Sequence, residues 1–367
     1  MDCMTDATYT CYLNQTSIAT ICIAIDHPQY IPIELSTSEL AMNIIDLEEN
    51  NLPRELLIEL LKDHATGKNI FWASSDYKRL GKGFSFFDQI ETTSVTGRYA
   101  HVVMPRVLKS KELKKKRTLE KAEIFTPAWV CNEMCNAWDE AYRARDSHFN
   151  EPIYKNGKYD WELCPYPIRF ADGISWQDYV LHNTLEITCG EAPYIVSRYD
   201  VATGEAIDLE RRIGLLDRKL RVICENVTSF EKWMQWVVKA FQSSYGYEWQ
   251  GDNILLAREN LMCSFVDYYE HCWKQDPSQE ELMRIAQIIS WNIFQMDGLK
   301  MVIPESCKNG VPVQSKGLFG NEEKVIYCEG CKKNNPKKHN GIPAMIMDWS
   351  NNRVIEFRSL YKSEKDI

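Results

Sequence analysis

Acidic residues lie on both sides of a glycine turn in the stretch LEITCGEAPYIVSRYD, which covers residues 185–200. The apolar residues before Gly190 predict a β-strand, and a glycine after a strand lets a ligand approach the backbone closely. Many such turns bind phosphates, because the N-terminus of a following helix favours negative charge. Here Glu186, Glu191 and Glu205 would repel a phosphate, and the G-x-G-x-x-G spacing is missing. The pattern favours a positively charged ligand, against the alternative of a purely structural turn.

A further carboxylate, Glu248, ends a second predicted strand in YGYEWQGDN. In doubly wound α/β proteins, an acid at the carboxyl end of the second strand binds ribose, because a carboxylate accepts two hydrogen bonds from a vicinal diol. S-adenosylmethionine combines a ribose with an amine and a sulfonium, so it suits both groups of acids. The alternative is a solvent-exposed glutamate at a strand end.

A pair of cysteines, Cys328 and Cys331, occurs in the sequence CEGC. Two thiolates on such a tight turn suit zinc, and a structural zinc site needs four ligands. Cys307 upstream and His339 downstream are the nearest residues that complete the set. We therefore expect a structural zinc that fixes the C-terminal hairpin, against the alternative of reduced, unligated thiols. A redox role is less favoured, because no thioredoxin-like helix is predicted after the pair.

Charge is distributed unevenly along the chain. The net charge is −9, which argues against extensive coating by nucleic acid. The segment Pro105–Lys121, PRVLKSKELKKKRTLEK, is nevertheless strongly basic. Such a segment is typical of an arm that contacts the phosphates of DNA, and the alternative is a solvated helix face or a linker.

Length and periodicity favour a globular α/β protein. The 367 residues suit two domains or one elaborated domain, and 44% hydrophobic residues can form a large core. Amphipathic patterns predict helices over 229–245 and 252–273, and residues 284–295 form a helix or a strand. Because helices alternate with the two strands described above, we expect a parallel, doubly wound sheet. Residues 342–360 predict a closing hairpin around an Asn351-Asn352 turn.

The chain divides by composition into two parts. Residues 1–105 form an N-terminal α+β block, in which 37–67 has helical spacing with Pro53 in a first turn and Gly67 as a stop. Residues 106–367 hold the α/β pattern, with an ordered insertion at about 140–185. The apolar run near the start is broken by charged and proline residues, so neither a signal peptide nor a membrane span is expected. The 13 cysteines, Cys272 among them, are then expected to be mostly reduced packing residues of a cytoplasmic protein.

Five short motifs follow one another along the chain: EIFTP, LEITCG, YGYEW, ARENL and NIFQ. In this order they resemble the motifs of the amino-methyltransferases that act on DNA. The resemblance is to the gamma-ordered group, which includes the methylation subunits of restriction-modification systems. From about Ile70 onward the chain looks like proteins labelled restriction endonuclease subunit M. The resemblance implies a Rossmann-like class I methyltransferase domain over 106–367, with S-adenosylmethionine as cofactor and DNA as substrate.

The same resemblance assigns residues to the cofactor. Thr126 and Pro127 match a Thr-Pro pair that contacts its methionine end. Glu186 takes the place of the acid that holds its amine, and Glu248 that of the ribose-binding acid. The turn between them contains, in chain order, Cys189, Gly190, Ala192 where a second glycine is usual, and the aromatic Tyr194.

The resemblance places the chemistry at NIFQ. Asn292 and Phe294 match the ends of Asn-Pro-Pro-Tyr/Phe, and Ile293 offers the backbone carbonyl between them. In the family, the Asn oxygen and that carbonyl accept hydrogen bonds from the amine of a flipped-out base, and the ring stacks on the base. Both prolines are missing here, and either one residue is lost or the aromatic is shifted. Gln295 directly follows Phe294, as a glutamine sometimes follows the aromatic in the family, which favours the loss of one residue.

We therefore expect methylation of an exocyclic amine in DNA, with adenine N6 favoured. The principal alternative is an inactive methyltransferase-like protein that binds DNA or a partner, and a weaker one is methylation of RNA or protein amides. The N-terminal block shows no target-recognition repeat. Choice of target sequence would then depend on a specificity subunit or on the insertion at 140–185.

Overall fold

Four parallel strands form the central sheet of the protein. The computed structural model describes residues 19–21, 54–317 and 320–361. The strand order is β1-β6-β7-β8, with bounds β1 (Ala19–Ile21), β6 (Thr184–Ile187), β7 (Ser244–Glu248) and β8 (Ile293–Gln295). The strands therefore follow one another across the sheet in chain order, with β6 between β1 and β7. Ligands of open α/β sheets bind outside the carboxyl ends of the strands.

The two faces of the sheet are covered by different elements. Side chains alternate between faces along a strand, so Tyr245 and Tyr247 of β7 point to one face and Gly246 to the other. The tyrosine face, together with Phe294, packs against the C-terminal residues Ile346 and Phe357. A Cβ on Gly246 would meet Cys189, Ile195 and Ile293 at 3.1–3.2 Å, so the opposite face is tightly packed at this position. The larger core of the molecule lies on that side.

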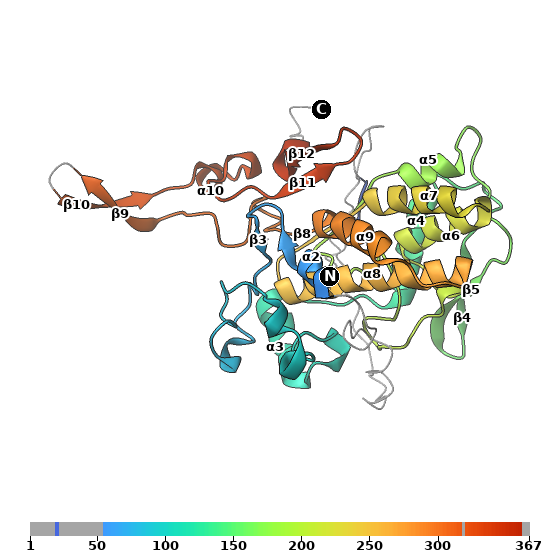
Figure 1. Cartoon of the computed structure of the whole chain (residues 1–367), viewed down its shortest axis with the longest axis horizontal. Coiled ribbons are helices and arrows are strands. Elements are labelled where there is room, and N and C mark those ends of the chain that lie inside the picture. Colours follow the sequence, from blue (N-terminus) through green and yellow to red (C-terminus); the bar gives the residue numbers. More distant parts are fainter. Residues whose placement is uncertain (1–18, 22–53, 318–319, 362–367) are drawn as a thin grey trace, which may run out of the picture.

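Helices make up most of the larger core. Their bounds are α6 (Leu215–Asn226), α7 (Phe230–Gln242), α8 (Gly251–Trp273) and α9 (Gln279–Asn292), and Figure 1 shows them side by side. α8 is buried on all sides along its first four turns, which explains why its sequence shows little amphipathic contrast. Its buried Arg258 donates hydrogen bonds to the carbonyls of Leu60, Lys62, Ser290 and Ile293, so it joins the ends of two neighbouring helices to α8.

The N-terminal block shares this core. It contains α2 (Arg54–Leu61) and the short hairpin β2 (Lys62–Asp63) and β3 (Lys68–Asn69). The prediction that Gly67 stops the helix is wrong, because α2 ends at Leu61 and Gly67 lies in the turn of the hairpin with a φ of 70°. Leu56, Leu60 and Trp72 belong to the same cluster of buried residues as Leu261 and Phe265 of α8. The expected boundary at residue 105 therefore does not divide the core. The part of the predicted helix over 37–53 and the apolar run after residue 21 lie outside the described residues.

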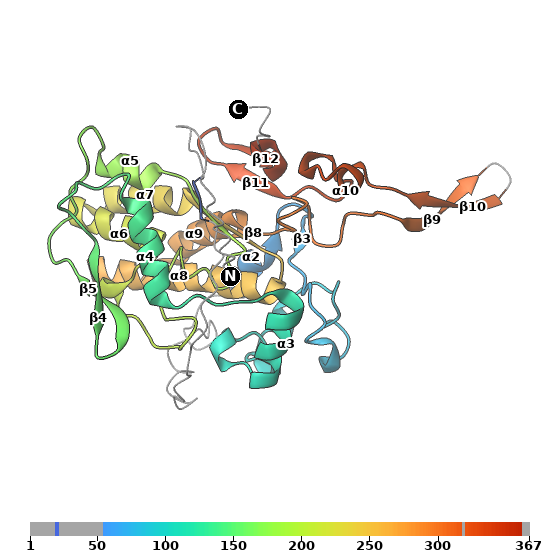
Figure 2. The same ribbon diagram turned by 180° about the vertical axis from the view of Figure 1, so that it is seen from behind.

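The basic stretch contains α3 (Lys111–Lys121), and α4 (Ala128–Asp139) follows it. The insertion at about 140–185 is ordered, as expected, and contains the hairpin β4 (Asn150–Lys155) and β5 (Lys158–Leu163), and α5 (Trp176–Leu181). Figure 2 shows α4 in front of α6, α7 and α8 when the molecule is seen from behind. A disulfide joins Cys224 of α6 to Cys272 of α8, so the expectation of a packing thiol is wrong for Cys272.

The C-terminal part leaves the body of the molecule and returns to it. An antiparallel ribbon of β9 (Val311–Gly317) and β10 (Gly320–Ile326) projects outward, followed by α10 (Glu329–Lys333) (Figure 1). The predicted hairpin is confirmed as β11 (Met345–Asp348) and β12 (Arg353–Glu356), with Asn352 at a φ of 49° in the turn. Among the described residues, no helix has both the length and the apolar character that a bilayer span requires. The mixed α/β class with a parallel sheet is confirmed.

Candidate functional site

The chain turns sharply at the carboxyl end of β6. Thr188, Gly190 and Ala192 all have left-handed backbone conformations, with φ of 47°, 54° and 63°. Such angles are unfavourable for residues other than glycine, and backbone strain of this kind clusters at ligand sites. The ring of Phe125 lies 3.6 Å from where a Cβ of residue 190 would stand. The loop therefore packs against the EIFTP segment at Gly190.

Two buried carboxylates flank this turn. One oxygen of Glu248 accepts a hydrogen bond from the amide of Gly190 at 3.0 Å, and the other accepts from the amides of Trp249 and Gln250. Glu186 accepts from the amide of Ile195 at 3.1 Å. A carboxylate offers about four acceptor positions, so both groups keep capacity for a ligand. Burial raises the pKa of Glu186 and of Glu248, and their mutual repulsion raises that of Glu186 further. A cationic or hydroxyl-bearing ligand would stabilise the ionised forms.

The EIFTP segment lies against the same turn. Pro127 precedes α4, whose first amide, from Ala128, donates to the carboxylate of Asp200 at 3.0 Å. Burial raises the pKa of Tyr194, and a hydrogen bond with Thr126 lowers it by a smaller amount. Cys189 and Tyr194 are both buried. The structure thus brings together the seven residues predicted to bind the cofactor: Thr126, Pro127, Glu186, Cys189, Gly190, Tyr194 and Glu248.

Two further acceptors at this edge were missed by the sequence analysis. Glu123 Oε1 and Gln250 Oε1 are buried and have no hydrogen-bond partner among the described residues. Glu123 is close enough to Glu248 to raise its pKa. Buried acceptors without donors are costly, so the edge suits a ligand rich in N–H and O–H groups. Both residues adjoin recognised motifs, since Glu123 begins EIFTP and Gln250 follows YGYEW by one residue.

Not every acid of the opening stretch belongs to this edge. The carboxylate of Glu191 accepts from the amide of Arg106 at 2.6 Å and from the hydroxyl of Tyr199 at 2.5 Å. It therefore fixes the start of the basic segment onto the turn. Glu205 is exposed on the next loop. The acids bonded to amides of this loop are Glu186 and Glu248, whereas Glu123 is paired with Arg117.

The structure does not bring the predicted catalytic residues to this edge. Asn292 is the last residue of α9 and lies where β8 begins, whereas Glu248 pairs with Gln295, where β8 ends. The Asn292 amide donates to the carbonyls of Phe241, Gln242 and Ser244, and its oxygen accepts from Trp349. Asn292 is thus at the opposite end of the sheet with all its hydrogen-bonding positions used.

The two residues after Asn292 are also occupied. The carbonyl of Ile293 accepts a hydrogen bond from Arg258 at 2.8 Å. The ring of Phe294 packs between Tyr247 and Phe357 on the face covered by the C-terminal hairpin. In the described structure, Asn292, Ile293 and Phe294 therefore have packing roles, and the predicted catalytic group does not form. The register of β8 is the physical reason, because Asn292 precedes the strand and Ile293 and Phe294 lie within it, instead of following it.

An Asn292→Ala variant is expected to lose stability and to keep its ligand affinity. The substitution leaves buried polar groups without partners, each at a cost of about 1–3 kcal/mol, so we expect a loss of at least about 2 kcal/mol. Urea unfolding of wild type and variant measures it, with Asn226→Ala as the control, because Asn226 is exposed and donates to the carbonyl of Val222. Full stability combined with selective loss of methyl transfer would show instead that Asn292 is catalytic.

Much of the basic segment is internal. Arg117 is fully buried and its guanidinium bonds to Asp252 and Asn253 of α8, and buried Lys109 bonds to Asp252 at 3.0 Å. Lys116 pairs with Asp76 of the N-terminal block at 2.7 Å. The interpretation as a free arm is therefore wrong for these residues. The segment holds α3 against the start of α8.

A second site lies at the base of the projecting ribbon. Cys307, Cys328, Cys331 and His339 have their ligand atoms within 4.8 Å of one another. Nδ1 of His339 lies 3.5, 3.4 and 3.6 Å from the sulfurs of Cys307, Cys328 and Cys331, and the sulfurs of Cys307 and Cys331 are 3.7 Å apart. Tetrahedral zinc sets S···S at about 3.8 Å and S···N at about 3.6 Å. The predicted four-residue group is assembled and could hold a metal ion.

Local backbone geometry prepares this group for a metal. A Cβ on Gly330 would lie 2.6 Å from the amide nitrogen of His339, so only glycine fits between the two cysteines of CEGC. Burial acts to raise the pKa of Cys328, but hydrogen bonds from the amides of Cys331 and Asn340 outweigh it and lower this pKa to about 6. Arg358 donates to the carbonyl of His339, which joins the group to the residues after β12.

Comparison of the chain with family models, with curated proteins and with solved structures finds no match. The resemblance to DNA amino-methyltransferases therefore stays a prediction, and the geometry of the two sites is what bears on function.

Proposed function

We propose that the chain binds S-adenosylmethionine at the carboxyl edge of β6 and β7 and transfers its methyl group to an exocyclic amine of a DNA base, with adenine N6 favoured. In this proposal the sheet is the core of a Rossmann-like methyltransferase. Glu186 would hold the amine of the methionine part, Glu248 the ribose hydroxyls, and the turn at Gly190 would lie beneath the ligand. The Cys307–Cys328–Cys331–His339 group would hold a structural zinc.

One observation carries the proposal: two buried, incompletely paired carboxylates lie on neighbouring parallel strands beside a left-handed turn at the carboxyl edge of the sheet. Such an edge disfavours phosphates and favours a cation with hydroxyl groups. The unpartnered acceptors of Glu123 and Gln250 add to the same preference, because the amine, the adenine amino group and the ribose are all donors.

A second candidate function is binding without methyl transfer. It is favoured by the position of Asn292, because the predicted amine-orienting group lies at the other end of the sheet. The protein would then use the ligand site and its DNA contacts in regulation or assembly with a specificity subunit. Only a transfer assay separates the two, because both require the same ligand site.

A Glu248→Gln variant is expected to bind S-adenosylmethionine about 10- to 150-fold more weakly than wild type. A hydrogen bond to a charged group contributes about 1.5–3 kcal/mol, and the variant loses the charge while nearly keeping the shape. Isothermal titration calorimetry measures the affinity. Burial raises the pKa of Glu186 and of Glu248. The affinity of wild type should therefore also fall as the pH is lowered, because protonation removes the negative charges that attract the ligand.

The matched control is Glu205→Gln, which removes one negative charge from an exposed position on the next loop. It should leave the affinity unchanged. If wild type binds no S-adenosylmethionine, or if both variants bind as wild type does, the ligand assignment fails. Transfer of a tritiated methyl group to mixed genomic DNA then decides between the enzyme and the binding protein.

A further inference from the structure

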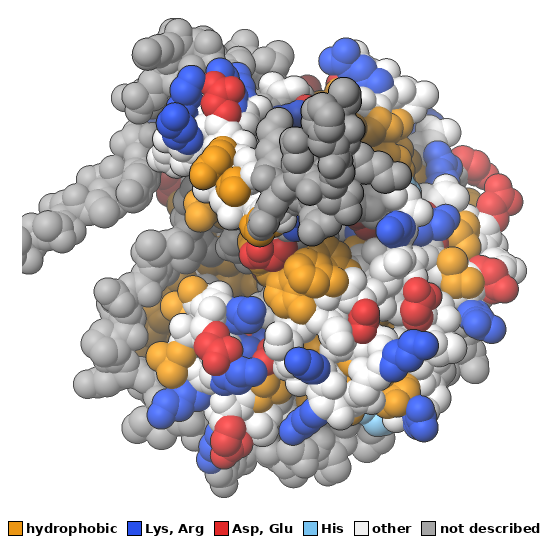
Figure 3. Space-filling view, turned by 90° about the vertical axis from the view of Figure 1, so that its left-hand side faces the viewer, with side chains coloured by type: hydrophobic (Ala, Val, Ile, Leu, Met, Phe, Trp, Pro, Cys, Tyr) orange, Lys and Arg blue, Asp and Glu red, His pale blue; other side chains and the backbone are white. Residues whose placement is uncertain are grey.

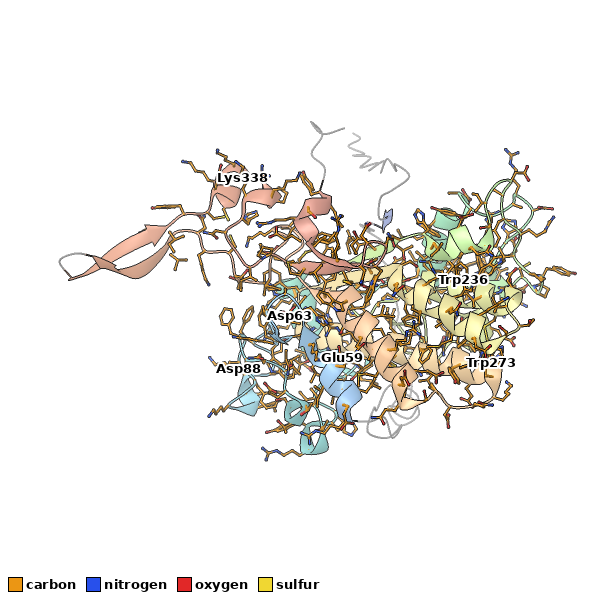
Figure 4. All side chains as sticks on the ribbon, turned by 45° about the horizontal axis from the view of Figure 1, so that its top comes forward. Glu59, Asp63, Asp88, Trp236, Trp273 and Lys338 are labelled. Carbon is orange, nitrogen blue, oxygen red and sulfur yellow. A yellow bond between two sulfur atoms is a disulfide. The ribbon has the colours of Figure 1, made fainter. Side chains whose placement is uncertain are left out.

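Three phenylalanines cluster on the outer side of the N-terminal block. The rings of Phe71 and Phe87 are stacked with centroids 6.3 Å apart, and Phe86 meets Phe87 edge-on at 4.8 Å. Phe87 is 67% exposed, whereas Phe71 and Phe86 are half-buried. Figure 3 shows hydrophobic side chains gathered near the middle of this side of the molecule, and Asp88, the next residue, is labelled on the block in Figure 4. An exposed ring supported by two others offers a flat surface to a ligand.

This aromatic cluster is attached directly to the proposed ligand edge. The Gln295 amide, at the end of β8, accepts from the amide of Phe71 at 3.1 Å and donates to its carbonyl at 2.9 Å. The same amide donates to the carbonyl of Trp249, the residue after Glu248, at 2.8 Å. A Cβ on Gly251 would lie 2.1 Å from the carbonyl oxygen of Phe71. The cluster is therefore held rigidly beside the carboxyl ends of β7 and β8.

The surroundings of the cluster are strongly basic. Residues 78–121, in which Lys109 and Arg117 are buried and paired with Asp252, contain twelve Lys and Arg against four Asp and Glu. Among them Lys78, Arg79, Lys82 and Lys115 are exposed. Lys121, the last residue of α3, lies over the ring of Phe86 at 5.9 Å. Exposed aromatic rings inside a positive surface are the combination that binds unpaired nucleic-acid strands, through base stacking and phosphate attraction.

We propose that the surface formed by Phe71, Phe86 and Phe87 stacks on bases of an unpaired DNA strand, whose phosphates contact the exposed cations of residues 78–121. This inference rests on the proposed function in naming DNA. It extends that function by specifying that the substrate is an unpaired or locally opened strand. A base extruded from a duplex needs a stacking partner outside the helix, and this surface lies next to the edge where the methyl donor would bind.

Fluorescence anisotropy with a labelled twelve-nucleotide thymidine strand tests the proposal. Phe87→Ala, at an exposed position where folding is not at risk, is expected to raise the Kd about 5- to 100-fold, the range that corresponds to one lost stacking contact. A strand of twelve abasic sites keeps the phosphates and removes the bases. It should bind wild type and Phe87→Ala equally weakly. Tyr166→Ala is the matched control, because Tyr166 is a 73% exposed aromatic residue in the insertion.

The outcomes separate this proposal from the proposed function. Equal binding of the thymidine strand by wild type, Phe87→Ala and Tyr166→Ala would overturn the stacking surface, whatever the calorimetry with S-adenosylmethionine shows. Loss of strand binding in Phe87→Ala alone would support it even if no methyl donor binds. A uridine strand bound more tightly than the thymidine strand would overturn the assignment to DNA in favour of RNA.

Discussion

Removing the metal from the Cys307–Cys328–Cys331–His339 group is expected to unfold the segment between residues 305 and 343 while the sheet stays folded. Outside residues 313–324, whose side chains are not described, Cys328 is the one buried apolar side chain of this segment. A segment without its own hydrophobic core needs another source of folding free energy, such as a bound metal ion. Structural zinc contributes about 10–16 kcal/mol in zinc-finger peptides. Chelation should make the ribbon sensitive to protease, as followed by mass spectrometry of the fragments.

Cysteine substitutions make this test specific. Cys331→Ser removes one ligand and should give purified protein with little zinc and a ribbon that is cleaved without chelator. Cys164→Ser is the control, because Cys164 is a free, half-buried cysteine outside the group. Cobalt substitution gives a second readout, since tetrahedral thiolate ligation has a characteristic absorption. Wild-type protein that carries no metal after purification and gains none on titration would contradict the assignment.

The features that sequence could predict here are short-range. The four metal ligands were found because CEGC contains two of them on one turn, and the other two are the nearest suitable residues on either side. The Asn351-Asn352 turn and the strand before Gly190 depend on local backbone preferences in the same way. The grouping of Thr126 with Glu186 and Glu248 could be predicted from the sequence, because parallel strands bring their carboxyl ends to one edge of the sheet.

The features that sequence could not predict depend on register and on tertiary pairing. NIFQ has the composition of a catalytic loop, but α9 continues through Asn292 and β8 begins at Ile293. Asn292 therefore lies at the amino end of β8, and the predicted ligand edge is at its carboxyl end. The basic segment has the composition of an exposed arm, but Lys109 and Arg117 are neutralised by an aspartate more than 130 positions away in the chain. Pattern alone does not identify such partners.

An Asp252→Asn variant is expected to be the most destabilising single substitution among the ion pairs of the described residues. The carboxylate of Asp252 is fully buried and bonds to Arg117, Lys109 and the hydroxyl of Tyr77. Its loss removes the described counter-ion of Lys109 and leaves Arg117 with Glu123 and Asp76. Removing one partner of a buried ion pair costs about 3–5 kcal/mol. The pairs also join the N-terminal block, the basic segment and α8, so the variant should loosen the ligand edge. Urea unfolding measures the loss of stability, and calorimetry with S-adenosylmethionine measures the effect on the site.

The pH dependence distinguishes a lost charge from lost packing. Burial alone would raise the pKa of Asp252, but Arg117 and Lys109 outweigh it and hold this pKa far below its ordinary value of 3.8. A carboxyl whose pKa is lower in the folded state stabilises the protein above the unfolded-state pKa, and this contribution is lost as the pH falls below it. The difference in unfolding free energy between wild type and Asp252→Asn should therefore be constant near neutral pH and shrink below about pH 4. Asp160→Asn, which breaks the half-exposed pair with Arg211, should cost less than about 1 kcal/mol. If Asp252→Asn costs no more than this control, Arg117 and Lys109 find other partners and the buried network does not position α3.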